Sequence, residues 1–111
     1  MSRLYITAIG LSDTPGDLPC EEQVTLCLAW LKEFSRPARG WSKRSSYGLK
    51  HTVENWSGQY IANGAFIEAV KRLGYGFRRC SYGSPNAEFR MMVNRNVSNP
   101  PKMARTEGTD D

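Results

Sequence analysis

The chain has 111 residues and a formal charge of +4 at pH 7, a length that fits one domain with a modest core and no obligatory disulfides or metal. It has no run of about 18 apolar residues, which excludes a membrane-spanning helix, and Arg3 is a thin positive flank with no small-residue cleavage site after it, which argues against an export signal. The three cysteines lack Cys-x-x-Cys spacing, so they favour a reduced, cytoplasmic setting over a zinc site or a disulfide framework.

Charge is distributed unevenly along the chain. From residue 11 to residue 34 five carboxylates accompany a single lysine, whereas the excess cations lie between Arg36 and Arg95. Such an asymmetry predicts an electrically polar molecule whose basic half contacts an anionic partner; an ordinary solvated surface is the alternative interpretation.

The first third of the chain predicts a strand, a loop and a helix. Leu4–Ile9 alternates with apolar residues on both sides, as in a covered strand. Residues 10–19 have the composition of a loop. A helix is predicted over Cys20–Phe34, because apolar residues recur there at spacings of three and four. Its apolar face consists of Val24, Cys27, Leu28, Leu31 and Phe34.

Residues 35–46 are predicted to be a flexible basic linker. Proline, glycine and serines are mixed with cations there, which is typical of an exposed connection that adapts to a partner. A structureless segment of about a dozen residues inside a small domain is more often functional or disordered than passive.

Two further helices are predicted from their boundary residues. Ser45 or Ser46 is expected to cap a helix that runs through Trp56 and ends at Ser57 and Gly58. Asn63 is expected to cap a third helix, which Gly74 terminates in a left-handed conformation. The apolar positions of the two helices are Leu49, Val53 and Trp56, then Phe66, Ala69, Val70 and Leu73.

The C-terminal part predicts a β-hairpin and a tail. Tyr75–Tyr82 and Ala87–Val93 are extended patterns separated by turn residues 83–86. Residues 94–111 are predicted to be a disordered tail, because they hold too few apolar residues to offset the cost of ordering. The expected fold is therefore one α+β domain, residues 1–93, with an N-terminal strand, three helices and a C-terminal hairpin. The order helix, helix, hairpin is compatible with a winged helix-turn-helix arrangement.

The candidate binding residues are cations with interleaved aromatic groups. Cations that neutralise phosphates make affinity dependent on salt, while an aromatic ring stacks on an unpaired base or, in the alternative, anchors its segment to the core. The set comprises Arg36, Arg39, Trp41, Lys43, Arg44, Tyr47, Lys50, Arg78 and Arg79.

Catalysis and cofactor binding receive less support from the residues. His51, the single histidine, lies three residues before Glu54, so a catalytic base is conceivable, but no nucleophile pattern accompanies it. We therefore predict no enzyme, no metal and no cofactor. Asn63 and Gly64 at the start of a helix offer N–H groups that suit one phosphate, although a capping role is the commoner use of such residues.

One stretch of the chain resembles a known group of proteins. The motif begins as SSYGLKH at residues 45–51 and continues as GxYIxNGAFI at residues 58–67, followed by Gly74 and the turn at residues 84–86. It is similar to small, mostly uncharacterised proteins carried by bacterial phages, plasmids and integrated elements, and it covers about the second half of the chain. The resemblance implies an origin in a mobile element and a cytoplasmic bacterial host, but it assigns no functional residue.

Taken together, these patterns predict a non-enzymatic protein that binds host machinery and blocks it, such as an anti-CRISPR-type inhibitor of a defence nucleoprotein complex. The expected partner is a host protein or nucleoprotein complex with an acidic surface, and DNA or RNA is a further candidate; no membrane partner is expected. The alternative function is that of a nucleic-acid-binding accessory or transcriptional regulator with a winged-helix-like domain. A small enzyme that uses His51 ranks third, and the oligomeric state is left open.

Overall fold

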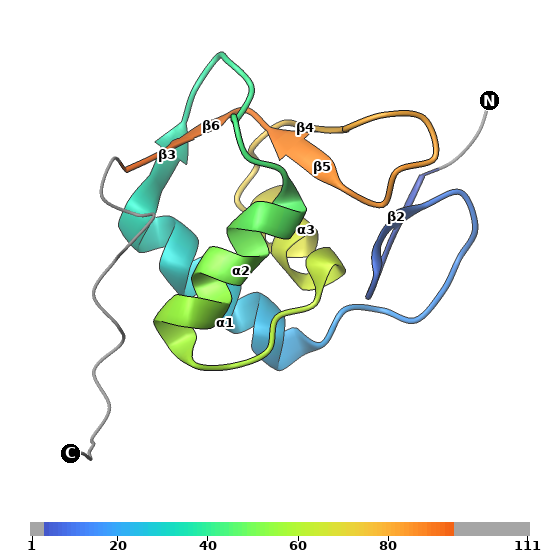
Figure 1. Ribbon diagram of the computed structural model, residues 1–111, viewed down its shortest axis with the longest axis horizontal. Coiled ribbons are helices and arrows are strands. Elements are labelled where there is room, and N and C mark those ends of the chain that lie inside the picture. The colour runs from blue at the N-terminus through green and yellow to red at the C-terminus, as the bar shows by residue number, and fades with distance from the viewer. Residues whose placement is uncertain (1–3, 95–111) are drawn as a thin grey trace.

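The computed structural model describes residues 4–94 and has the predicted α+β class (Figure 1). The N-terminal hairpin lies at one end of the molecule, the pair β3 and β6 at the other, and the helices lie between them. Residues 95–111 of the predicted tail lie outside the described residues. The elements in chain order are β1 (Tyr5–Thr7), β2 (Gly10–Ser12), α1 (Glu21–Phe34), β3 (Ser35–Pro37), α2 (Ser46–Ser57), α3 (Asn63–Arg72), β4 (Phe77–Arg79), β5 (Ala87–Phe89) and β6 (Met91–Val93).

The core is built around α3, which buries seven of its ten residues. Phe66 of this helix lies edge-on to Trp30 of α1 and to Phe89 of β5, with ring centroids 6.0 and 5.5 Å apart. All three side chains are fully buried, and burying a large apolar side chain contributes roughly 1.5–3 kcal/mol. Most of the apolar positions predicted for α1 and α3 are buried, but Trp30 was not among them, and the predicted Leu28, Phe34 and Leu73 are only partly buried.

The N-terminal segment forms a hairpin, so the prediction of one strand over Leu4–Ile9 is wrong. β1 pairs antiparallel with β2, with Thr7 opposite Gly10. The connecting residues Ala8 and Ile9 are apolar and lack the Asn-Gly type of signal that marks a two-residue turn. Gly10 has a φ of +129°, and a Cβ there would lie 2.3 Å from the carbonyl oxygen of Pro85, so this hairpin requires glycine at that position.

The basic linker is bonded along one edge of the C-terminal strands, and its first three residues form β3 where an unstructured connection was predicted. β3 pairs antiparallel with β6. Beyond it, Ala38 N–H donates to the Arg90 carbonyl at 3.1 Å and Ser42 N–H donates to the Phe89 carbonyl at 2.7 Å. The segment therefore extends the strand pairing.

Two serine hydroxyls complete that edge. Ser42 Oγ accepts a hydrogen bond from Phe89 N–H at 3.1 Å, and Ser46 Oγ accepts one from Ala87 N–H at 3.0 Å. Exposed strand edges present unpaired N–H groups, and these two hydroxyls satisfy the N–H groups of β5. Serines that suggest a pliable loop in the sequence thus fix the loop to the strand.

The helix boundaries agree with the sequence at three of four signals. Gly74 adopts the predicted left-handed conformation, with a φ of +85°, and Gly58, predicted to end α2, follows the helix with a φ of +73°. Ser45 occupies the N-cap position of α2, although its side chain makes no capping hydrogen bond. Asn63 is the first residue of α3 and Ala62 is its N-cap, so the prediction that Asn63 caps the helix is wrong.

The C-terminal hairpin is present in a shorter form, with β4 paired to β5. β5 and β6 are consecutive parts of the last extended segment and are separated only by Arg90. β4 pairs with β5 and β3 pairs with β6, and this strand order is compatible with a winged helix. The helix that would read DNA in such a domain is α3, and its exposed end is already engaged: Arg72 pairs with Glu21 at 2.5 Å and Glu68 at 2.9 Å. The other residues of α3 are mostly buried, so this helix is unsuited to enter the major groove of DNA.

Candidate binding site at the basic loop

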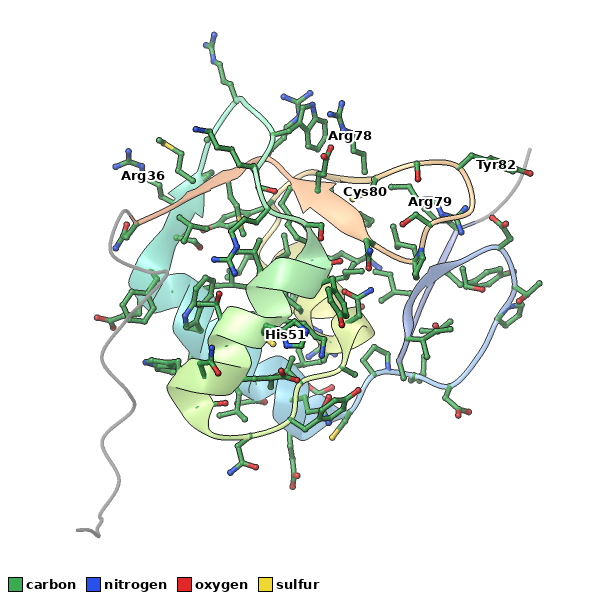
Figure 2. The ribbon with its side chains drawn as sticks, viewed as in Figure 1. Arg36, His51, Arg78, Arg79, Cys80 and Tyr82 are labelled. Carbon is green, nitrogen blue, oxygen red and sulfur yellow. The ribbon has the colours of Figure 1, made fainter. Side chains whose placement is uncertain are left out.

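The predicted binding residues fall into an exposed group and an internally bonded group. Arg36, Arg39 and Lys43 are exposed, and no carboxylate among residues 4–94 forms an ion pair with any of them. Figure 2 places Arg36 and Arg78 along one edge of the molecule, above the helices. Arg36 and Arg78, two residues of the predicted basic surface, thus lie along the same edge of the molecule.

Trp41 holds two arginines on this edge. The guanidinium carbon of Arg78 lies 4.1 Å from the centroid of the indole ring, and that of Arg90 lies 4.3 Å from it. Arg78 Nε also donates to Glu88 Oε1 at 2.9 Å, and the Arg90 guanidinium donates to the carbonyl oxygen of Arg39. Guanidinium groups stack well on aromatic faces, with about 0.5–1 kcal/mol for an exposed pair. Trp41, a candidate for stacking on a base, is used as a platform for cations.

Arg90 is a residue of this site that the sequence reasoning missed. Ala87, Phe89 and Met91 are buried, so strand alternation places Glu88 and Arg90 on the outer face, beside Arg78 on the neighbouring strand. That alternation is the signal by which Arg90 was detectable. Gly76 makes room for it, since a Cβ at that position would lie 3.2 Å from Arg90 Cδ.

A groove of about 650 Å³ lies between loop residues 38–44 and β6. Leu49 and Met91, which are almost fully buried, and the half-exposed Met92 give it an apolar lining. Lys43 and Arg44 also line it. Arg44 is held in place by hydrogen bonds to the Gly48 carbonyl at 2.7 Å and to Thr52 Oγ1 at 2.6 Å. Apolar surface and positive charge therefore meet in one depression.

Lys50 and Arg79 are bonded inside the fold. The Lys50 side chain is 7 % exposed and its Nζ lies 3.0 Å from Glu54 Oε2, near the rings of Tyr47 and Tyr60. Arg79 pairs with Asp13 Oδ1 at 2.8 Å and donates to the Ser84 carbonyl, which joins β4 to the N-terminal segment. Neither cation belongs to the edge that carries Arg36 and Arg78. Tyr47 is half-exposed on α2, with Lys50 and His51 beside its ring.

His51, labelled in Figure 2, forms a close pair with Glu54 on α2. His51 Nδ1 lies 2.8 Å from Glu54 Oε1, while Glu54 Oε2 accepts the N–H of Ile61 at 3.0 Å. Burial by itself would raise the pKa of Glu54, but the hydrogen bonds from Ile61, Lys50 and His51 outweigh it and hold the pKa below its ordinary value. The carboxylate orients the imidazole, and among the described residues His51 has no hydrogen bond to a hydroxyl or thiol nucleophile. Through its bond to Ile61 N–H, Glu54 attaches the connection between α2 and α3 to α2.

The N-terminus of α3 is covered by the chain itself. Gly64 N–H donates to the Ala8 carbonyl at 3.0 Å, and Asn63 Nδ2 lies within 3.2 Å of Ile9 O, Pro85 O and Asn86 Oδ1. A Cβ on Gly64 would lie 1.6 Å from the Thr7 carbonyl oxygen. The interpretation of Asn63 and Gly64 as a phosphate site is therefore wrong: these groups join the helix to both hairpins.

The described residues contain neither a membrane helix nor a metal-ligand cluster. No helix within residues 4–94 has the length and apolar character to cross a bilayer, and nowhere in that range do three His, Cys, Asp or Glu side chains gather to hold an ion. No family model, curated protein or solved structure matches the chain. The geometry of the basic edge is consequently the main support for a functional proposal.

Proposed function

We propose that this protein is a non-enzymatic binder that attaches to an anionic surface of bacterial host machinery and blocks it, as an anti-CRISPR-type inhibitor of a defence nucleoprotein complex would. Two observations support the proposal: the guanidinium groups of Arg78 and Arg90 lie over the Trp41 ring, and β3 with the loop that follows carries further exposed cations. We call this surface the cationic edge; it comprises Trp41, Arg78 and Arg90 together with Arg36, Arg39 and Lys43.

The arrangement of the cationic edge suits recognition of carboxylates or phosphates. Guanidinium groups bind oxyanions in a bidentate manner. Arg78 and Arg90 each use one N–H within the fold, toward Glu88 and the Arg39 carbonyl, and their other N–H groups make no hydrogen bond among the described residues. Stacking on Trp41 and the bond to the Arg39 carbonyl restrict Arg90 before any partner arrives, so less side-chain entropy is lost on binding. The bonds from Ala38 and Ser42 to the strand hold the loop that carries the other cations.

Blocking a host complex requires coverage of a surface and no chemistry. A standard interface covers roughly 800 Å² of each partner, and complementary charge speeds association and excludes wrong partners. The resemblance of residues 45–67 to proteins of mobile elements supports a host-directed role and a bacterial cytoplasmic setting.

Nucleic-acid binding is the second candidate, because stacked guanidinium groups suit phosphodiesters as well as carboxylates. With α3 buried, such binding would involve mainly the phosphate backbone and would depend steeply on salt. A regulator that reads a sequence through α3 is less well supported.

The blocking role is tested by phage plating on hosts with active CRISPR systems. We expect the wild-type protein to raise plating and to co-purify with an effector subunit, and Arg78→Gln with Arg90→Gln to abolish both effects. Lys32→Gln with Lys71→Gln removes the same charge from exposed residues outside the cationic edge and is expected to retain both. Unchanged plating across several system types would contradict the proposal.

The other two functions are tested separately. A gel shift with DNA or RNA at about 50 mM salt that disappears in the Arg78→Gln, Arg90→Gln variant would favour the nucleic-acid role; absence of a shift removes that candidate. His51→Ala is expected to retain blocking, and loss of blocking in a folded His51→Ala protein would speak against a non-enzymatic role.

A further inference from the structure

We infer that the groove beside β6 receives an apolar side chain from an acidic segment of a partner protein. The inference rests on the proposed function and narrows it, because it makes the contact on this face one between proteins. The groove is the space between loop residues 38–44 and β6 described above.

The groove has the dimensions and lining of a side-chain receptor. Its volume of about 650 Å³ falls in the range of roughly 300–1,000 Å³ that is usual for ligand pockets. Leu49, Met91 and Val93 contribute aliphatic or thioether surface to its lining. Met92 is 52 % exposed, and flexible methionines adapt to the shape of an inserted group. Leu49 and Met91 are already almost fully buried, so the apolar surface that an occupant would remove from water belongs mainly to Met92 and Val93.

Positive charge surrounds the apolar surface on more than one side. Lys43 and Arg44 line the groove from the loop, and Arg36 Nη2 lies 3.3 Å from Met92 Sδ. Lys43 and Arg36 have no carboxylate partner among the described residues. An apolar centre with a charged rim is the usual anatomy of a protein interface. The complementary segment carries an aliphatic or aromatic residue with Asp or Glu on either side.

The same features disfavour a nucleic acid as the occupant. Unpaired bases bind by stacking on free aromatic faces, whereas the Trp41 ring is engaged by Arg78 and Arg90. Ser42, Lys43, Arg44 and Asn94 bring polar groups to the lining, but its apolar part, Leu49, Met91, Met92 and Val93, offers no hydrogen bonds to base edges, on which sequence readout depends. We therefore assign the groove to a protein side chain.

The experiment uses the full chain and a random peptide library displayed on phage. We expect selected peptides to share one large apolar residue flanked by acidic residues. The occlusion variant is Gly40→Phe, because no heavy atom lies within 4 Å of a Cβ built at Gly40 and this residue lines the groove. Gly40→Phe is expected to weaken binding of the selected peptide at least tenfold, on the order of an interface hot spot. The control Asn55→Phe introduces the same side chain at an exposed position of α2 outside the groove and is expected to bind like the wild type.

The outcomes separate this inference from the proposed function. A peptide consensus without an apolar residue, or equal peptide binding by Gly40→Phe and Asn55→Phe, overturns the inference. If Gly40→Phe still blocks the host system while Arg78→Gln with Arg90→Gln does not, the groove is irrelevant and the cationic edge stands. If both variants still block, both ideas fail. Oligo-dT binding that Gly40→Phe abolishes would assign the groove to nucleic acid and likewise overturn the inference.

Discussion

The N-terminus of α3 and the basic loop are the two places where the sequence suggests an anion site, and the fold treats them in opposite ways. At α3 the donors of Asn63 and Gly64 are bonded to carbonyl and amide oxygens of the two hairpins. At the loop the backbone is bonded to β5 and β6, while the cations of residues 36, 39 and 43 have no acidic partner among the described residues. A polar group is available to a partner only where distant parts of the chain do not reach it.

Substitution of the covered site is expected to have the largest effect. Gly64→Ala places a Cβ where the Thr7 carbonyl oxygen lies, and since backbone must move, we expect a loss of unfolding free energy above about 4 kcal/mol. The measurement is denaturant unfolding, with Gly40→Ala as the control at an open position, where the expected change is within about 0.5 kcal/mol. Equal denaturation midpoints for Gly64→Ala and Gly40→Ala would mean that the Thr7 carbonyl of the N-terminal hairpin does not restrict the space at Gly64.

Loss of the Glu54 carboxylate ranks second. Glu54→Gln leaves Lys50 buried without its partner and is expected to destabilise the protein by about 2–3 kcal/mol at neutral pH. Because folding lowers the pKa of Glu54, this stabilisation is fully present above its ordinary value of 4.5 and is lost as pH falls through the lower folded pKa. Unfolding curves of both proteins from pH 7 to acid test this, and a gap that widens in acid would refute the sign. Glu33→Gln, at an exposed position, is the matched control.

Asn63 is expected to follow, with a cost of about 2 kcal/mol for Asn63→Ala. The substitution removes the three hydrogen bonds that Asn63 Nδ2 makes to Ile9, Pro85 and Asn86, each worth about 0.5–1.5 kcal/mol, although the Pro85 carbonyl keeps the N–H of Leu11. Asn55→Ala, on the exposed surface of α2, controls for the loss of an asparagine side chain. Similar thermal midpoints for these two variants would argue against a joining role for Asn63.

The smallest effect is expected at the open site. Arg39→Ala with Lys43→Ala removes two exposed, unpaired cations, so the change in stability is expected to stay within about 0.5 kcal/mol. Arg79→Ala, which breaks a partly buried pair with Asp13, is expected to cost about 1 kcal/mol. Calorimetric midpoints compare the two; a larger loss for the exposed pair would show that the loop cations hold the fold together.

Local signals in the sequence were sufficient for the helices and for part of the strands. The apolar spacing of α1 and the glycines at 58 and 74 predict the helix positions, because both signals act within a few residues. The N-terminal hairpin was missed because its turn is Ala8 and Ile9. The serine contacts of the loop were missed because Ser42 and Ser46 meet strand residues more than forty positions away, and such partners leave no local trace.

The motif at residues 45–51 and 58–67 contains residues that maintain the fold. Ser46 accepts from β5, Lys50 pairs with Glu54, and Asn63 and Gly64 join the hairpins. These contacts maintain the fold, whereas the cationic edge lies mostly outside the motif. A search for function among the motif residues would therefore be directed mainly at residues that maintain the fold, as the inclusion of Lys50 in the binding set shows.

Main-chain atoms attach the loop to the strand, through the N–H groups of Ala38 and Ser42 and the carbonyl of Arg39. Side chains at positions 39, 40 and 43 are therefore free to vary without loss of that attachment. If the proposed target changes its binding surface by mutation, substitutions at these positions can produce new specificities quickly on an unchanged framework. The same positions are natural sites for randomisation when the framework is to be redirected to a chosen target.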